Sequence, residues 1–569
     1  MVMKKFVVVF FIVVIITCNI SADALATLYT STDPIVTWVE RILLQQGYSL
    51  LPTVSPYSGY QLLQKLHTIS TTSLSYEDKK NYDIIEQKLL NYSYNNESPK
   101  FAYDAGLRLS PELYIHSNDS ELLTEREWFF NQKARADMAS LYGQAIYGNH
   151  VYGVFDYGIR KTRGWRSATK ELSFTGTFNT NITFEDKFIE RASPYKAYLG
   201  FANEWMTFSI GRDTLSIGRG NTGNLLLGNH LDYHDYLHLS LHSEAVNYSM
   251  NAIHFNTIDP DKKIALTTSF RTGIRLFATH TLEFDILKRV KLSITDSVLF
   301  YASHLDIRMF NPLMFYHNYY NLDPDINPDL PREFNEVNNL MLLAAEATLS
   351  PSILIYGQWA IDQIQTVNEQ DPTDTPNAFG CMLGLEFSKS IAAGSFYGFI
   401  EGVYTSPYLY LIGDEEYVEF PKTGWNLSLV GAMNVPPPWK SSGLGYIGYV
   451  HGPDSIVAAC RIGYEKIDSY DVHFDIHFGM HGENGLEAFK KISQTLDTIG
   501  SNEYDRFSPS GIVEYRLAAG IGTSWILIRN LKVHSQLHYL HRWNFRNIAH
   551  QTFEDFQFVL GVSYTLKVL

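Results

Sequence analysis

Histidine is the first residue type in this chain whose spacing could carry chemistry. His230, His234, His238 and His242 recur every four residues, and on a helix this spacing would place the imidazoles on one face, as a zinc site requires. However, residues 236–242 alternate between apolar and polar types, which is typical of a strand. Neighbouring histidines in a strand lie about 13 Å apart, far too wide to share an ion at a Zn–N distance of about 2 Å. We therefore interpret them as a polar strand face and expect no metal.

A glycine-rich stretch over residues 211–229 contains two candidate ligand-binding arginines. Its sequence is GRDTLSIGRGNTGNLLLGN. The glycines resemble a nucleotide-binding loop only superficially, because the stretch has no Gly-Lys-Ser/Thr and no parallel βαβ unit is expected around it. We select Arg212 and Arg219 as cations that would lie near acidic sugars.

A second stretch, residues 311–320, is rich in aromatic and amide side chains and reads NPLMFYHNYY. Sugar rings offer apolar C–H faces to aromatic rings and hydroxyl edges to Asn and His. We therefore select Tyr316, His317 and Tyr319 as groups that could stack on or hydrogen-bond to a glycan. The alternative is an aromatic girdle at the membrane interface combined with loop packing.

Other chemistries have weaker support in the sequence. Residues 323–336 read DPDINPDLPREFNE and could bind calcium through oxygen atoms, but the spacing matches no tight calcium loop, so a solvated acidic loop is favoured. Neither G-x-S-x-G on a strand-to-helix turn nor H-E-x-x-H occurs. We predict that the protein is not an enzyme and needs no cofactor.

From about residue 103 onward the apolar side chains recur with a period of two. Residues 472–480, 513–521 and 556–568 show the alternation most clearly, with His473 and His477 in the polar phase. These stretches run about 10–13 residues, longer than ordinary soluble strands and close to the length of a tilted membrane strand. Short and long connections alternate in the second half of the chain, as in outer-membrane barrels. We predict an all-β fold, a transmembrane antiparallel barrel of about 18 strands, with 16 as the nearest alternative.

The residues before the barrel divide into two parts. Two lysines, a short apolar run and Ala22-Asp23-Ala24 predict a signal peptide over residues 1–24, with lipidation of Cys18 as a less favoured alternative. Helical periodicity then predicts a small helical periplasmic segment over residues 25–102, with the barrel over residues 103–569. The segment is either a lid or docking module, or a packing plug or spacer. Its three helices are expected near residues 34–46, 57–69 and 76–90.

Composition agrees with a membrane barrel. Aromatic residues make up 14% of the chain, as aromatic girdles would require, and the net charge of −15 disfavours a nucleic-acid partner. Cys381 and Cys460 both lie in the apolar phase of their strands, so we expect both to face lipid and form no disulfide. The protein is expected in the outer membrane, in contact with its lipid, with the helical segment and the C-terminus in the periplasm.

At the two stretches singled out above, the chain resembles the Wzi family of capsule-assembly outer-membrane proteins. The resemblance rests on a glycine and leucine pattern and on an Asn-Pro-Leu loop, although the family's tryptophan before G-x-G is replaced by Ser216-Ile217. It implies a lectin-like barrel that holds surface polysaccharide, with further contacts to export or assembly proteins in the periplasm. The matching residues are Gly211, Arg212, Gly218, Gly220, Leu225, Leu227, Asn229, Asn311, Pro312 and Leu313.

Two functions remain open at the level of sequence. The first is attachment or assembly of surface polysaccharide by glycan binding. The second is a porin-like diffusion channel or a substrate-specific outer-membrane transporter. A lumen blocked by inward side chains would favour binding, whereas an open constriction with opposed charges would favour conduction.

Overall fold

The computed structural model describes most of the chain. The described residues are 24–90, 101–118, 129, 134–148, 150–161, 177–184, 189–190, 195–257, 274–302, 305, 307–316, 336–363, 377–391, 394–411, 429–434, 442–485 and 507–567. Residues 1–23, with nearly all of the predicted signal peptide and Cys18, lie outside them, as do His317, Tyr319 and most of the acidic loop 323–336.

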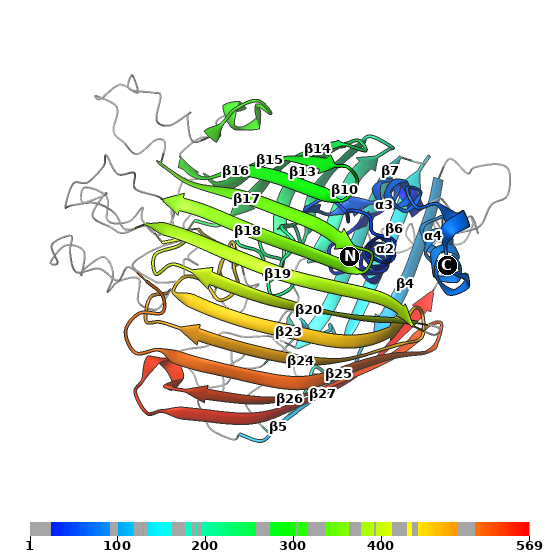
Figure 1. Cartoon of the computed structure of the whole chain (residues 1–569). Coiled ribbons are helices and arrows are strands. Elements are labelled where there is room, and N and C mark those ends of the chain that lie inside the picture. The colour runs from blue at the N-terminus through cyan, green and yellow to red at the C-terminus, as the bar shows by residue number, and fades with distance from the viewer. Residues whose placement is uncertain are drawn as a thin grey trace, which may run out of the picture.

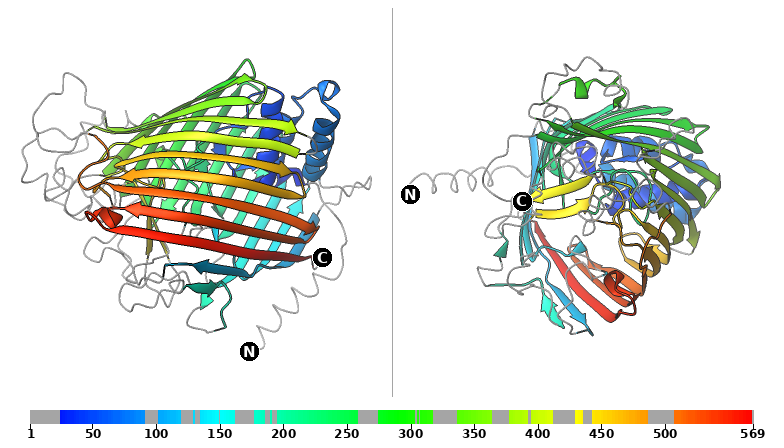
Figure 2. Two further views of the ribbon diagram at one scale, coloured as in Figure 1. Left: turned by 60° about the horizontal axis from the view of Figure 1, so that its bottom comes forward. Right: turned by 90° about the vertical axis from the view of Figure 1, so that its left-hand side faces the viewer.

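Eighteen strands of the described chain form one closed antiparallel sheet (Figures 1 and 2). The ring closes where the last strand pairs with β4, and β5 pairs with the same strand farther along, so β4 and β5 together count as one strand of the wall. The prediction of a barrel of about 18 strands is confirmed. The wall consists of β4 Phe101–Leu109 with β5 Glu112–His116, then β6 Ala139–Tyr147, β7 Val151–Lys161, β10 Lys196–Ala202, β11 Met206–Asp213, β13 His234–His242, β14 Val246–Phe255, β15 Ile274–Ile286, β16 Val290–Ala302, β17 Glu336–Ser350, β18 Ile353–Gln363, β19 Ala378–Ile391, β20 Gly394–Thr405, β23 Ser455–Lys466, β24 Tyr470–His481, β25 Glu514–Ile528, β26 Leu531–Trp543 and β27 Thr552–Lys567.

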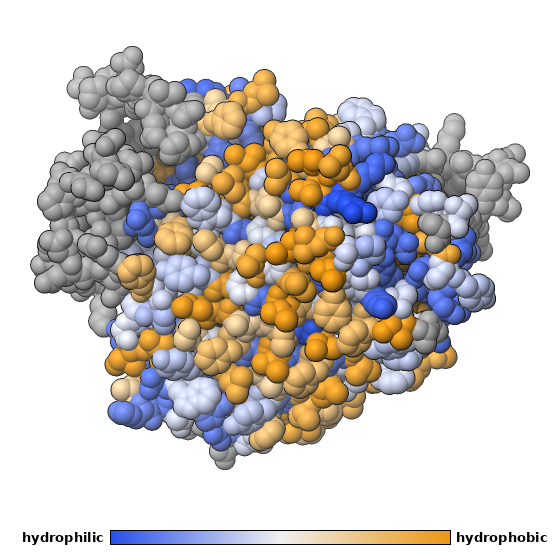
Figure 3. Space-filling model, in the orientation of Figure 1, coloured by the Kyte–Doolittle hydropathy of each residue, from blue (hydrophilic) through white to orange (hydrophobic). Residues whose placement is uncertain are grey.

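The alternation along each strand separates an apolar outer face from a more polar interior. In β27, Phe556 and Leu560 are exposed on the outside, whereas Asp555 and Gln557 are buried on the inside. Figure 3 shows the resulting apolar belt over the outer face of the barrel. Exposed apolar side chains on a closed wall are suited to lipid, because lipid tails replace the protein core that would otherwise cover them.

The histidine series confirms the strand interpretation. His234, His238 and His242 lie on β13 and are 1%, 0% and 7% exposed, and His238 Nδ1 is 2.7 Å from Asn251 Oδ1. Within the described residues no group of three metal-ligating side chains could hold an ion.

The two cysteines also lie as predicted. Both are free, Cys381 is exposed and Cys460 is half-buried. Cys381 on β19 shares the outward phase with Leu383 and Leu385, while its neighbour Met382 is buried.

Three helices precede the barrel, as the periodicity predicts: α2 Pro34–Gln45, α3 Gly59–Leu66 and α4 Tyr76–Leu90. No helix of the described chain combines the length and apolarity that a membrane span needs. The second helix is shorter than expected because Tyr57 and Ser58 form strand β3 (Tyr57–Ser58), and Ser58 caps the helix in a capping box with Gln61. Asp33 precedes α2 without capping it; its Oδ2 accepts hydrogen bonds from Thr30 instead.

The helices lie at the end of the barrel where the strand connections are short (Figure 1). Ser49 N donates to Lys288 O in the β15–β16 turn at 2.7 Å, and Ser352 N in the β17–β18 turn donates to Leu44 O at 2.8 Å. Helix α2 also contacts β18 and β19. The buried faces of the helices join the same apolar core as inward side chains of the wall. The helices thus pack against the inside of the wall at this end of the barrel, and the role of the segment, lid or docking module against packing plug or spacer, stays a prediction.

Small two-stranded sheets complete the described structure. β1 (Leu28–Tyr29) pairs with β3 within the N-terminal segment, and β2 (Val54–Ser55) pairs with β12 (Ser216–Ile217) from the glycine-rich stretch. β21 (Val430–Asn434) and β22 (Ser442–Tyr446) form a hairpin, and β8 (Phe178–Thr180) and β9 (Ile189–Glu190) extend the wall. The β2–β12 pair links the helical segment to a loop of the barrel through backbone hydrogen bonds.

We expect the outer belt to be sensitive to charge. Leu383→Arg should lower the free energy of unfolding by about 2–4 kcal/mol, because it places a cation in the apolar belt. Tyr76→Arg, on an exposed part of α4, should change it by less than about 0.5 kcal/mol. Urea titration of the protein in lipid vesicles measures both. Equal losses for the two variants would contradict a lipid-facing position for Leu383.

Candidate functional site

A buried ionic network lies inside the barrel where the helical segment meets the wall. Arg219 Nη1 is 2.8 Å from Glu40 Oε1 on α2, and Nη2 donates to Leu51 O at 2.9 Å. Its Nε faces Glu346 on β17. Lys291 Nζ on β16 donates to the same Leu51 carbonyl and lies 3.4 Å from Glu346 Oε1. One loop arginine therefore connects the helical segment to the wall.

The charge of Arg219 is strongly stabilised in this position. Burial by itself would lower the pKa of the guanidinium, but the carboxylates of Glu346 and Glu40 outweigh that effect and raise the pKa well above its ordinary value. The arginine therefore stays charged at every accessible pH. Because its three nitrogens all have partners within the protein, its geometry is that of a structural anchor.

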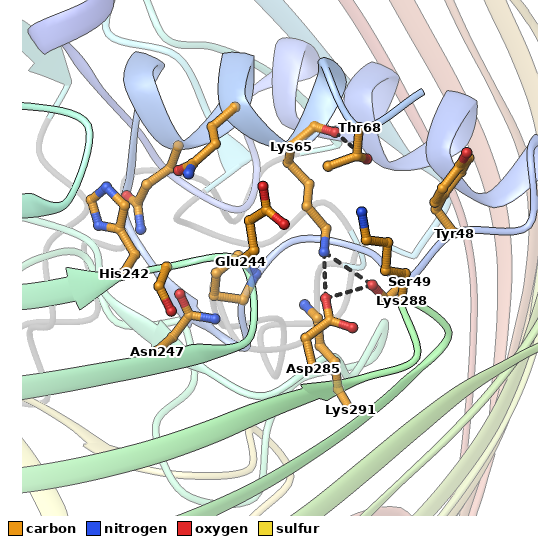
Figure 4. Close-up of a pocket in the computed structure, with 14 residues that line it drawn as sticks. Tyr48, Ser49, Lys65, Thr68, His242, Glu244, Asn247, Asp285, Lys288 and Lys291 are labelled. Atoms are coloured by element: carbon orange, nitrogen blue, oxygen red, sulfur yellow. Dashed lines mark hydrogen bonds and ion pairs between the residues drawn. The ribbon is translucent and has the colours of Figure 1, made fainter. Parts of the chain in front are cut away.

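A second anchor lines a pocket at the short-turn end (Figure 4). Lys65 Nζ on α3 is 2.5 Å from Asp285 Oδ2 on β15 and donates to Ser49 Oγ at 3.0 Å. Burial, followed by the nearby charge of Lys291, lowers the pKa of Lys65, while Asp285 opposes the shift. The Lys65–Asp285 pair joins α3 to β15, so the pocket adds to the attachment of the helical segment.

The glycine-rich stretch folds into the lumen after β12. Glu401 on β20 accepts hydrogen bonds from the backbone N–H groups of Asn221 and Thr222 at 2.8 and 2.9 Å. The hydroxyl of Tyr356 donates to the same carboxylate at 2.5 Å. Gly220 is required sterically, since a Cβ there would lie 1.7 Å from Gly223 O. The motif therefore shapes a loop that is held by side chains of the opposite wall.

One continuous apolar core fills the part of the lumen bordered by β13 to β23. It joins the three helices to the inward-folded loops and to inward side chains of the wall. Tyr410 links two of these loops, since its hydroxyl donates to Leu225 O at 2.5 Å and accepts from Tyr449 N at 3.0 Å. The loop residues of this core are Leu215, Ile217, Leu225, Leu226, Leu227, Leu231, Tyr408, Leu409, Tyr410, Leu411, Leu429, Ile447 and Tyr449.

The wall formed by β23 to β27 is different, because many of its inward side chains are charged or polar. Arg461 Nε lies 2.5 Å from Asp475 Oδ1, and Arg516 Nε lies 2.8 Å from Glu514 Oε1. The side chains of the two arginines remain 39% and 33% exposed. Such a surface offers donors and acceptors that are already oriented by neighbours, as hydroxyl-rich ligands require. We call the inward side chains of β23–β27 the polar wall.

Aromatic rings lie beside the polar wall. Phe129 stacks on the ring of His538 with centroids 3.9 Å apart. His451 and His477 face one another with centroids 5.6 Å apart. Burial, followed by the charge of nearby His477, lowers the pKa of His451 well below its ordinary value, so its ring is neutral at physiological pH. Flat rings beside ordered polar groups are a combination that suits sugar rings.

The three selected residues that the structure describes, Arg212, Arg219 and Tyr316, do not converge on one site. Arg219 lies inside the lumen, whereas Arg212 alternates with inward residues of β11 and lies on the outer face, where its Nε is 2.6 Å from Asp235 Oδ1 and its guanidinium is 3.9 Å from the Tyr233 ring centroid. Tyr316 is 1% exposed and packs against the outside of the wall. His317 and Tyr319 lie outside the described residues. A glycan role for these five residues remains a prediction.

None of the candidate ligand-binding residues selected from the sequence belongs to the polar wall. The alternation of residues 472–480 places His473 and His477 in the lumen, but nothing local indicates which stretch of the lumen borders the apolar core and which does not. That depends on which strands the helices and loops cover, and these contacts join residues hundreds of positions apart. Counting the charged residues in the inward phase of each predicted strand is the sequence signal that could have indicated the polar wall.

Comparison with known proteins identifies the fold. No family model and no curated protein matches the chain. Among solved structures, the chain is similar to Wzi of Escherichia coli, an outer membrane protein involved in group 1 capsule assembly and described as a carbohydrate-binding β-barrel. The two share 12% identity over 94% of this chain and 98% of that chain, with a TM-score of 0.55. The resemblance found in the sequence is thus matched at the level of the fold.

Outer-membrane channels match less well. DcaP of Acinetobacter baumannii shares 9% identity over 82% of this chain and 97% of that chain, with a TM-score of 0.35. OprD of Pseudomonas aeruginosa shares 8% identity over 82% and 94%, with a TM-score of 0.38.

The two arginines of the glycine-rich stretch should differ sharply in their effect on stability. Arg219→Met removes the cation that pairs with half-buried Glu40 and leaves buried Glu346 with Lys291 alone, and it should cost about 3–5 kcal/mol. Arg212→Met removes a partly exposed pair and should cost at most about 1 kcal/mol. Urea titration in detergent micelles, monitored by tryptophan fluorescence, measures both values. A loss for Arg212→Met as large as that for Arg219→Met would contradict the anchoring role.

Proposed function

We propose that the protein binds a surface polysaccharide in the outer membrane and takes part in its attachment or assembly. The observation that carries the proposal is the division of the lumen. The helical segment and the inward-folded loops pack one part of it solid, and the polar wall lines another part. A solid core inside a barrel opposes free diffusion of solutes, whereas an oriented polar surface beside aromatic rings favours retention of a hydroxylated polymer.

The likeness to the carbohydrate-binding barrel of Escherichia coli supports this proposal over the channel alternative. It spans nearly the whole length of both chains, including the helical segment. A simple diffusion channel has no need of a helical segment that is fastened to the wall by buried charges. The two functions differ in what the lumen must do, so conductance and retention separate them.

We propose an orientation in which the short turns, the helical segment and the C-terminus face the periplasm. The helices and the end of β27 lie at the same end of the barrel (Figure 1), and short turns face the periplasm in this class of barrel. The long loops then face the cell surface, where a polysaccharide would be held. Exposed α4 is available at the periplasmic side for contacts with export or assembly proteins.

Retention of polysaccharide should depend on the exposed cations of the polar wall. We expect the double variant Arg461→Gln/Arg516→Gln to weaken binding of an acidic surface polysaccharide roughly tenfold or more, because each charge-assisted hydrogen bond contributes about 1.5–3 kcal/mol. The measurement is cell-bound polysaccharide in a deletion strain that carries the variant, together with affinity on a glycan array.

The matched control is Lys389→Gln, which removes an exposed basic residue from the outer face of β19. It should leave retention unchanged. Heat-modifiable migration of each variant on gels verifies that the barrel has folded. Equal retention in the double variant and the control would remove the polar wall from the proposal.

The filled lumen also leads to a conductance prediction. Purified protein in planar bilayers should produce smaller and rarer openings than an unfilled 18-stranded barrel would, because the apolar core fills the β13–β23 part of the lumen. Removing the anchor with Arg219→Met should increase the frequency of openings, since the loop and helices are then less firmly held. Large steady openings of the unaltered protein would favour the channel alternative.

A further inference from the structure

Two polar side chains lie on the outer face of the barrel. His280 on β15 and Asp296 on β16 are direct partners in the strand register. The residues on either side of His280 and Asp296 point inward: the hydroxyls of Thr281 and Thr295 are 2.9 Å apart in the buried interior. Because side chains alternate along a strand, His280 and Asp296 must point outward, toward the lipid.

The pair lies well within the membrane-spanning part of the wall. His280 and Asp296 are each six residues from the ends of their strands at the short turn, Ile286 and Val290. At a rise of about 3.3 Å per residue and a tilt of about 45°, this places them about 14 Å from the turn, near the middle of an apolar band of about 25 Å. An uncovered polar side chain at this depth costs several kcal/mol.

Residues 307–316, which we call the strap, cover the pair. The strap begins with the short helix η7 (Ile307–Phe310), which lies outside the wall beside β15 and β16 (Figures 1 and 2). Tyr316 N donates to Asp296 Oδ2 at 2.6 Å, and the Tyr316 hydroxyl is 2.9 Å from His280 Nε2. His280 Nδ1 is 3.2 Å from Met314 O. The strap is thus attached to the outer face by the two polar residues.

Several backbone groups of the strap also have hydrogen-bond partners within the protein. The Tyr316 hydroxyl donates to Met309 O at 2.7 Å, and Leu313 N donates to Asn311 Oδ1 at 3.1 Å. Met314 N donates to Asn311 O at 3.1 Å. Irregular backbone is tolerated in the apolar band only when its polar groups find partners inside the protein. The strap meets this condition at the positions nearest to the wall.

The outer surface of the strap is apolar. Met309 and Tyr316 pack against Ala278, Val298 and Phe300. In contrast, Ile307, Leu313 and Phe315 are 80%, 86% and 65% exposed. On the same strands, nearer the short turns, Leu282, Phe284, Leu292 and Ile294 are exposed as part of the apolar belt. The exposed side chains of the strap therefore continue the lipid-facing belt over the part of the wall that the strap covers.

We propose that the strap inserts into the outer leaflet of the membrane, where Leu313 and Phe315 contact lipid acyl chains, and that the His280–Asp296 pair is the socket that holds it there. Continuity with the apolar belt points to lipid as the occupant of this surface. The strap then widens the barrel's lipid contact on the β14–β16 side and fixes the position of this side in the leaflet. This inference does not depend on polysaccharide binding.

Spin labelling tests the depth of the strap. The three native cysteines are replaced by alanine, and a nitroxide is attached to Leu313→Cys in the full chain reconstituted in phospholipid vesicles. We expect collisions with oxygen to dominate over collisions with a water-soluble nickel chelate, as for a reference label at Leu383→Cys in the apolar belt. A second reference label at Tyr76→Cys, on exposed α4, should show the reverse.

Two results would overturn the proposal. Accessibility to nickel at Leu313→Cys equal to that at Tyr76→Cys would place the strap in water. An immobilised label shielded from both reagents would place a protein surface, such as a second copy of the chain, against the strap.

Removing the socket tests its role separately from the position of the strap. Tyr316→Phe removes the hydroxyl that bridges His280 and Met309, and it should increase both the mobility of the label at 313 and its accessibility to nickel. Leu385→Ala, a matched apolar change elsewhere on the outer belt, should leave the label unaffected. If Tyr316→Phe leaves the label as it was, the hydroxyl contacts do not hold the strap.

Discussion

The structure depends on one requirement, which is that every wall strand must pair with two neighbours. A backbone N–H or C=O group without a partner is costly in an apolar membrane, so a sheet that spans it has to close. Closure occurs between β27 and β4 with β5. Once the ring is closed, each strand has an outside and an inside, and the period of two in the sequence becomes a separation of lipid-facing from inward side chains.

Closure creates a lumen, and the protein fills much of it by a different kind of interaction. Apolar burial joins the helices, the inward loops and the wall into one core, and buried ion pairs determine how these parts are aligned. Arg219 is central because it contacts a helix, a backbone carbonyl and the wall at once. A buried pair contributes little net stability compared with an apolar replacement, but loss of one partner is severe, so such pairs determine geometry strongly.

On the outer face, which contacts lipid, it is the polar side chains that must be covered. Most outward side chains are apolar, and one polar pair deep in the apolar belt, His280 with Asp296, is covered by residues 307–316. A polar pair inside the lumen and a polar pair facing lipid thus have opposite consequences. The first can remain exposed to water and ligands, as in the polar wall, whereas the second requires a cover. The same residue types therefore serve ligand contact in one place and attachment in the other.

Local patterns were sufficient for the strands, the three helices and the outward position of both cysteines, because each depends on a period of 2 or 3.6 within about fifteen residues. The sequence also determined that His238 and His242 could not share a metal ion, since strand geometry separates them. Only the tertiary structure decided that Arg212 and Arg219, seven positions apart, lie on opposite sides of the wall with different partners. It also decided that Tyr316 packs outside the barrel and that the lumen is filled on one side, because these outcomes rest on contacts between residues far apart in the chain, which no local period records.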